Sequence, residues 1–212
     1  MSATDRPDES ARFWDDHYRR HTPPIDLRVN TRLAEITANL TPGEALDLGC
    51  GAGGDALWLA RRGWRVTAVD VSAVAIARLA ERAHALALDE HITAERHDLA
   101  RSFPAGRFDL VSAHYLHTSF DLPREHVLRA AAHALSPGGR LLVVDHGSVA
   151  PWSWNQDPDA RFPSPTEIAA GLDLDPGRWS VERTDAPRRM ATGPDGRTAE
   201  VVDHVLLIRR TG

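Results

Sequence analysis

A run of glycines preceded by an acidic residue is the segment of this sequence that most directly predicts ligand binding. It extends from Leu46 to Gly54 and consists of Leu-Asp-Leu-Gly-Cys-Gly-Ala-Gly-Gly. Glycines let the backbone turn sharply and let a ligand approach the main chain. A helix predicted to begin directly after the run adds free N–H groups and the positive end of its dipole. A nucleotide-like ligand is therefore expected here.

One interpretation of this loop is a dinucleotide site. Gly49, Gly51 and Gly54 match the pattern GxGxxG, and Asp70 follows about 20 residues later, a spacing that suits a carboxylate bound to ribose hydroxyls. An NAD-dependent oxidoreductase is thus an alternative supported by the loop alone.

A second interpretation takes more of the sequence into account. Asp47 lies two residues before Gly49, where an anion would repel a pyrophosphate but suit a cationic ligand. Gly53 completes an Asp-x-Gly-x-Gly-x-Gly pattern, and Asp98 supplies a further carboxylate that could accept from an exocyclic amine. A ligand with a cationic amino-acid end, a ribose and an adenine fits this set, and S-adenosylmethionine is such a ligand.

On these residues the chain resembles the Rossmann-like, class I S-adenosylmethionine-dependent methyltransferases. The matching segments span roughly half the chain and are 46–54, 69–72, 97–99, 108–111 and 135–139. The Asp-Leu-Gly-Cys-Gly start is similar to small-molecule methyltransferases of the tellurite-resistance and thiol types.

The resemblance implies which residues hold the cofactor. Asp47 would hold its amino-acid end, Asp70 its ribose hydroxyls and Asp98 its adenine amine. The full implied set is Asp47, Gly49, Cys50, Gly51, Gly53, Asp70, Val71, Asp98, Leu99, Ala113 and His114.

Methyl transfer by in-line displacement depends mainly on alignment and on exclusion of water, and a base is needed only when the acceptor carries a proton to remove. Histidine titrates near neutral pH, so His117, after the fourth predicted strand, and then His146, after the fifth, are the candidate bases. A structural role, in which either ring bonds to backbone or packs, remains the alternative for both.

The acceptor pocket is expected among aromatic side chains, which suit an apolar or aromatic acceptor. The candidates are Trp14, Tyr18, Tyr115 and Trp152. The resemblance implies that members modifying nucleic-acid bases carry an Asn/Asp-Pro-Pro-aromatic motif where this chain has Ala113-His114-Tyr115-Leu116. A metal set of His114, His117, Asp145 and His146 is conceivable, but no metal is expected.

Alternating predicted elements must position these residues. The expected strands are 44–48, 64–69, 92–96, 107–113, 140–145, 179–184 and 201–209. Helices are expected at 9–20, 30–39, 53–62, 72–88, 123–135 and 166–172. This order predicts an α/β, doubly wound, mostly parallel seven-stranded sheet with helices on both faces and an antiparallel last strand.

A single methyltransferase domain over residues 1–212 is expected. Residues 1–40 would form an N-terminal helical cap and residues 44–146 the cofactor-binding core. The remainder, 147–212, would supply a loop over the active face, 150–165, and a C-terminal strand pair joined by a turn at 193–196.

The composition of the chain narrows the class of protein and of partner. The chain has 212 residues, a formal net charge of −5, one cysteine and 25 basic residues that are all arginine. This balance disfavours nucleic acid and membrane surfaces as partners, and the absence of lysine excludes Schiff-base chemistry. No apolar run reaches the ~18–20 residues of a membrane span, so a cytoplasmic enzyme acting on a small-molecule acceptor is expected, with a non-catalytic S-adenosylmethionine-binding protein as another alternative. Oligomeric state stays open.

Overall fold

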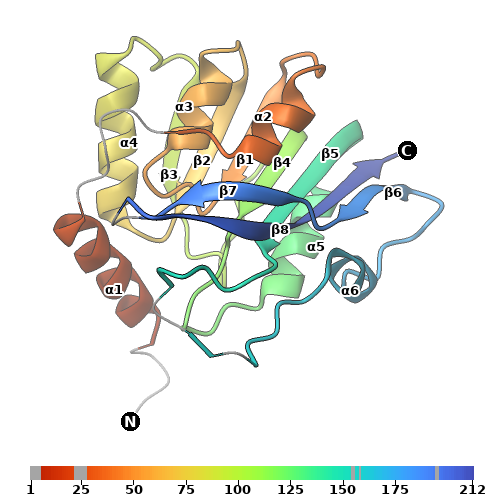
Figure 1. Ribbon diagram of the computed structural model, residues 1–212. Helices are drawn as coiled ribbons and strands as arrows, with labels where there is room; N and C mark the ends of the chain where they lie inside the picture. Colours follow the sequence, from red (N-terminus) through yellow and green to blue (C-terminus); the bar gives the residue numbers. More distant parts are fainter. Residues whose placement is uncertain (1–5, 22–27, 154–155, 158, 194–195) are drawn as a thin grey trace.

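A computed structural model describes residues 6–21, 28–153, 156–157, 159–193 and 196–212. Its strands are β1 (Glu44–Leu48), β2 (Arg65–Asp70), β3 (Ile92–Arg96), β4 (Phe108–His114), β5 (Leu135–His146), β6 (Trp179–Asp185), β7 (Arg188–Thr192) and β8 (Thr198–Arg210). They form one sheet in the order β3-β2-β1-β4-β5-β8-β6, with β7 paired to β8 (Figure 1). β1 to β5 pair in parallel and β8 runs antiparallel to β5 and β6. The predicted fold class is confirmed.

Helices cover both faces of the sheet and enclose two apolar cores. They are α1 (Arg6–Arg20), α2 (Thr31–Thr37), α3 (Gly54–Ala60), α4 (Ala73–Ala85), α5 (Arg124–His133) and α6 (Pro165–Gly171). Successive side chains of a strand point to opposite faces. Ala45 of β1 therefore packs with α2, α3 and α4, whereas its neighbour Leu46 packs with α5 and α6.

The carboxyl ends of the parallel strands meet at one edge of the sheet. Leu48, Asp70, His114 and His146 end β1, β2, β4 and β5 respectively. Ligands of open α/β sheets bind outside this edge. The glycine loop and the predicted histidines are thereby brought together although they are far apart in sequence.

The C-terminal segment contains one more strand than the sequence predicts. The turn at 193–196 joins β7 to β8 rather than β6 to β8, and Gly193 N donates to Arg197 O at 2.7 Å. The last pair between β8 and β5 is Asp203 with His146, and residues 198–202 of β8 pair instead with β7. The β7–β8 hairpin therefore projects past the carboxyl edge of the sheet.

β7 lacks the apolar alternation that predicts a strand, because its residues are Arg-Arg-Met-Ala-Thr and none is fully buried. Its pairing with β8 is what makes it a strand. The described part of 150–165 is irregular before α6 begins, as expected. None of the helices in the described ranges has the length and apolar character that a membrane span requires.

Candidate active site

The glycine loop folds into a tight turn between β1 and α3. Gly49 N and Cys50 N both donate to Val69 O at 2.9 Å. Gly51 and Gly53 have φ of +52° and +82°, which side chains rarely tolerate. A Cβ on Gly53 would lie 2.4 Å from Leu79 Cδ1, so close helix packing also requires glycine. Burial raises the pKa of the Cys50 thiol, which therefore stays protonated.

Asp70 fixes this loop to the end of β2. Its Oδ2 accepts from Gly51 N at 3.0 Å and its Oδ1 from Ser72 N at 2.9 Å. Burial raises its pKa, partly offset by these backbone hydrogen bonds. A carboxylate oxygen has two lone pairs, so each oxygen retains capacity for a further donor. Such an acidic group at a cavity wall suits a pair of ligand hydroxyls.

A first cavity of about 670 Å³ opens beside Asp70. Val71 and Leu99 provide apolar surface, and Asp98 lies next to Leu99. The Asp98 Oδ1 accepts from Ala100 N at 3.1 Å, which fixes the carboxylate at the end of β3. The cavity thus combines apolar surface with the two carboxylates of Asp70 and Asp98.

The N-terminal helix α1 covers one side of the first cavity with Trp14 and Tyr18. Asp15 attaches the helix to α4, because its Oδ1 accepts from Ser72 Oγ at 2.6 Å and from Val74 N at 3.1 Å. Arg78 of α4 also donates to Tyr18 O. Both predicted acceptor residues on α1 therefore lie on the same cavity as Asp70.

A buried polar cluster lies under the glycine loop. Asp55 of α3 accepts from Asn30 N at 2.6 Å through Oδ1 and contacts His114 Nδ1 at 2.7 Å through Oδ2. Asp47 is 3% exposed and accepts from Ser112 Oγ at 3.0 Å. Burial and the charge of Asp55 raise the pKa of Asp47 to about 7.

Two atoms of this cluster lack partners. Asp47 Oδ2 and His114 Nε2 are buried without a hydrogen bond among the described residues. Ligand atoms of Asp47, Asp55 and His114 lie within 4.8 Å of one another, a set different from the four residues considered from the sequence. Because Asp55 is already engaged, the open positions are two acceptors, which suit a cation bearing N–H groups. The expected absence of a metal stays a prediction.

A second cavity of about 590 Å³ opens on the other side of Tyr115. Its walls come from the glycine loop, the ends of β4 and β5, the loop after β5, and β7. The side chains that line it include Asp47, Asp55, His114, Tyr115, His146, Trp152 and Arg189. Gly49 and Tyr115 line both cavities, so the two cavities meet at these residues.

The two candidate bases lie on different cavities. His117 lines the first, and its Nε2 is 3.1 Å from Asp145 Oδ1. Burial raises the pKa of Asp145, but the contacts with His117 and Arg124 outweigh burial and leave it lowered. His146 lines the second cavity and stacks on Tyr115 with ring centroids 4.4 Å apart. Burial, together with nearby His117, lowers the pKa of His146.

Most predicted cofactor residues lie at one of the cavities. Gly49, Asp70, Val71, Asp98 and Leu99 line the first, and Asp47, Cys50 and His114 line the second together with Gly49. Gly51 and Gly53 shape the loop from outside both cavity walls.

The structure does not place Ala113 at either cavity. It is fully buried, because it shares the strand face of Val111 that packs against α5. Arg189 and Asp203, which lie at or beside the second cavity, were not predicted from the sequence as site residues. β7 carried no strand signal, and nothing local marks Asp203 as buried.

Known proteins resemble this chain in sequence. Residues 45–139 match a family described as a methyltransferase domain. A 27-O-demethylrifamycin SV methyltransferase of Amycolatopsis mediterranei is 33% identical over 140 residues, 63% of this chain and 49% of that protein. A ribosomal RNA small subunit methyltransferase C of Alcanivorax borkumensis is 34% identical over 121 residues, 55% of this chain and 36% of that protein.

Residues 45–139 of this chain are thus similar to a methyltransferase domain, and its fold is that of the Rossmann-like S-adenosylmethionine-dependent methyltransferases. It spans about half the length, or less, of the curated relatives it matches. The chain shares its fold with a structure reported as "Conversion of a Disulfide Bond into a Thioacetal Group during Echinomycin Biosynthesis" (TM-score 0.72, 26% identity, 94% of this chain and 92% of that one). TehB from Haemophilus influenzae has the same fold (TM-score 0.68, 17% identity, 93% and 67%).

The residues of the site fit S-adenosylmethionine, the cofactor that the methyltransferase family uses. The first cavity offers the carboxylates of Asp70 and Asp98 together with apolar surface from Val71 and Leu99. The unpartnered Asp47 Oδ2 and His114 Nε2 lie beside the glycine loop. An ammonium group would supply the missing N–H donors, and a nucleoside would match the carboxylates and the apolar surface.

Proposed function

We propose that this protein transfers the methyl group of S-adenosylmethionine to a small molecule held in the second cavity. The observation that carries the proposal is the junction of the two cavities at Gly49 and Tyr115. One cavity has the carboxylates and apolar surface for a nucleoside, and the other has space for an acceptor. A reactive group at the junction is reachable from both sides.

In this proposal the first cavity holds the nucleoside of the donor, and the amino-acid end of the donor reaches the glycine-loop side of the second cavity. Asp70 accepts from the ribose hydroxyls, Val71 packs against the adenine, and Asp98 accepts from its amine. Asp47 receives the ammonium group through Oδ2, which also favours its ionised form. The cofactor supplies a methyl group bonded to a cationic sulfur.

The remaining residues shield the reaction and handle the proton. Trp14 and Tyr18 on α1 cover the first cavity and limit entry of water. His146 is the better-placed base, because it lines the acceptor cavity, whereas His117 lines the donor cavity. The lowered pKa of His146 keeps the ring neutral near pH 7, as a proton acceptor must be.

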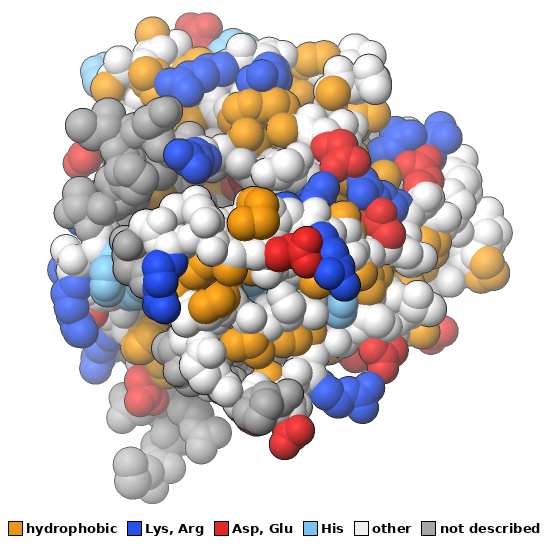
Figure 2. Space-filling view, in the orientation of Figure 1, with side chains coloured by type: hydrophobic (Ala, Val, Ile, Leu, Met, Phe, Trp, Pro, Cys, Tyr) orange, Lys and Arg blue, Asp and Glu red, His pale blue; other side chains and the backbone are white. Residues whose placement is uncertain are grey.

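A nucleic-acid acceptor is disfavoured by the charge of the protein. The formal net charge is −5, and arginine side chains on the face shown in Figure 2 are interspersed with acidic ones. Backbone phosphates require an excess of positive charge. A small molecule is therefore the proposed acceptor class.

Calorimetry with S-adenosylhomocysteine and with NAD tests the donor. We expect saturable binding of S-adenosylhomocysteine and no binding of NAD. Binding of NAD alone would contradict the proposed donor and favour an NAD-dependent oxidoreductase. Transfer of a labelled methyl group is then measured on phenols, thiols, amines, carboxylic acids and a ribosomal RNA fragment. Cofactor binding without transfer to any of them would indicate a non-catalytic binding protein, and transfer to RNA alone would contradict the proposed acceptor class.

A further inference from the structure

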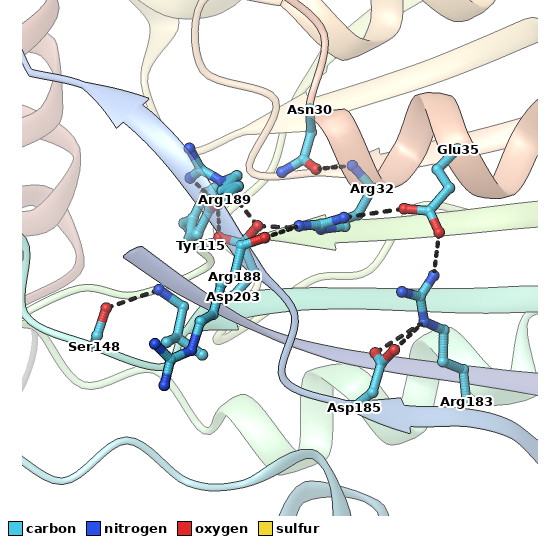
Figure 3. A network of polar contacts seen from close by, with 11 residues as sticks. Asn30, Arg32, Glu35, Tyr115, Ser148, Arg183, Asp185, Arg188, Arg189 and Asp203 are labelled. Carbon is cyan, nitrogen blue, oxygen red and sulfur yellow. Dashed lines mark hydrogen bonds and ion pairs between the residues drawn. The ribbon is translucent and has the colours of Figure 1, made fainter. Parts of the chain in front are cut away.

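A buried carboxylate joins four elements at the edge of the second cavity. Asp203 of β8 is 1% exposed. It accepts from Arg32 Nε of α2 at 3.3 Å, from Arg189 Nε of β7 at 2.8 Å, and from the Tyr115 hydroxyl at 3.0 Å. Figure 3 shows the two arginines approaching Asp203 from either side. None of these contacts is needed to hold the donor.

The charges around Asp203 are balanced only through the wider network. Two guanidinium groups share the single carboxylate of Asp203. Arg32 has a second anion, Glu35, at 3.1 Å, but Glu35 is half exposed and also contacts Arg183 at 3.0 Å. Tyr115 stays neutral, because burial and the nearby Asp203 raise its pKa to about 12. Arg183 also pairs with Asp185 at 2.8 Å, so the network balances three guanidinium groups with three carboxylates. Arg189 differs from the other two arginines in the N–H groups that it leaves open at the second cavity rather than in a net charge.

Arg189 presents its guanidinium group to the second cavity. Asp203 holds its Nε, and its Nη2 donates to the Tyr115 oxygen at 3.1 Å. Its Nη1 makes no hydrogen bond or ion pair with a described residue, and the side chain is 30% exposed. The guanidinium lines the second cavity with the aromatic rings of Tyr115 and Trp152.

A guanidinium fixed on one side and open on the other is pre-organised to bind an oxyanion. We propose that Arg189 binds a carboxylate group of the acceptor and that Tyr115 and Trp152 pack against its aromatic portion. The preferred acceptor is thus an aromatic carboxylic acid. This inference rests on the proposed function, because it assigns the second cavity to the acceptor.

Two carboxylates, Asp47 and Asp55, also line this cavity. They lie at the glycine loop, where they face the ammonium group of the donor in the proposed function. The donor carries a carboxylate of its own, so the test must separate the two possible sources of the anion bound at Arg189.

The probe is benzoate, titrated into the protein saturated with S-adenosylhomocysteine, with benzyl alcohol as the neutral analogue. We expect benzoate to bind the wild-type protein, and Arg189→Met to weaken it by about tenfold or more. Arg188→Met is the matched control on the same strand. Arg188 is 71% exposed, pairs with Glu200 at 2.7 Å and lines neither cavity, so its loss is expected to leave benzoate binding unchanged.

Absence of benzoate binding to the wild-type protein, or equal binding to both variants, would overturn the assignment. If Arg189→Met does not fold, Arg189→Gln replaces it, since its amide can still donate to Asp203 without carrying charge. Unchanged benzoate binding in that variant has the same consequence.

S-adenosylhomocysteine affinity provides the separate readout. We expect it to be the same in Arg189→Met and Arg188→Met. A loss in Arg189→Met without a change for benzoate would assign Arg189 to the donor carboxylate and overturn the inference. Failure of the wild-type protein to bind S-adenosylhomocysteine would instead contradict the proposed function, and benzoate titrated alone would still report on Arg189.

Discussion

The hydroxyl of Tyr115 donates a 3.0 Å hydrogen bond to Asp203, which lies 88 residues further along the chain. Tyr115 has φ of +50°, a conformation that costs a non-glycine residue about 1 kcal/mol or more. The bond to Asp203 and the stacking on His146 hold it there. A strained tyrosine is thus fixed where the two cavities meet.

Removal of the Asp203 carboxylate should destabilise the protein strongly. Asp203→Ala leaves Arg32 and Arg189 without their shared buried anion, and we expect a loss of ~3–5 kcal/mol in the free energy of unfolding. Urea denaturation measures it. The control is Asp185→Ala, which breaks an exposed pair with Arg183 and should cost less than ~1 kcal/mol. Equal effects of the two substitutions would show that the network contributes little.

Loss of the Asp70 charge should weaken donor binding. Asp70→Asn keeps the shape of the side chain but replaces a carboxylate by an amide, and the expected loss of S-adenosylhomocysteine affinity is about ten- to hundredfold. Calorimetry measures it against Asp89→Asn, because Asp89 is exposed, pairs with His84 at 3.1 Å and lines neither cavity. An affinity that matches the control would remove Asp70 from the proposed donor site.

Asp47 should make stability depend on pH in an unusual direction. Its pKa in the folded protein is about 7, above the ordinary aspartate value of 3.8. The folded state therefore binds more protons than the unfolded state between these values, and this contribution to stability is lost as pH rises through about 7. Asp47→Asn should remove that loss and stabilise the protein by ~1–3 kcal/mol at pH 8 relative to pH 4. Thermal and urea unfolding at both pH values test it, and a pH-independent difference would contradict the raised pKa.

His146 should affect turnover more than donor binding. With an acceptor identified by the labelled-methyl assay, we expect His146→Gln to lower kcat by ~100-fold or more if the acceptor must lose a proton. S-adenosylhomocysteine affinity should stay unchanged. His117→Gln is the comparison, because its ring lines the donor cavity and contacts Asp145. A larger fall in kcat for His117→Gln would make His117 the base, the role first expected for it.

Local sequence patterns are enough to predict the core of the fold and the residues of the proposed donor site. Strands such as Glu44–Leu48 and the Ser72 cap of α4, which accepts from Ala75 N at 3.2 Å, depend on local composition and hydrophobic pattern. The glycine loop and Asp70 are likewise predictable. The loop joins a strand to a helix, and Asp70 ends the next parallel strand, so both lie at the carboxyl edge of the sheet.

The residues of the proposed acceptor cavity, in contrast, come together through tertiary contacts that the sequence does not reveal. β7 is a strand because β8 pairs with it, and Arg189 lines a cavity because that hairpin extends past the end of β5. Arg32 meets Asp203 across 171 residues of sequence. Contacts at such separation depend on how the whole sheet is assembled, so no local pattern of residue types records them. The same reason explains why His117 and His146, equivalent in sequence as residues at strand ends, line different cavities.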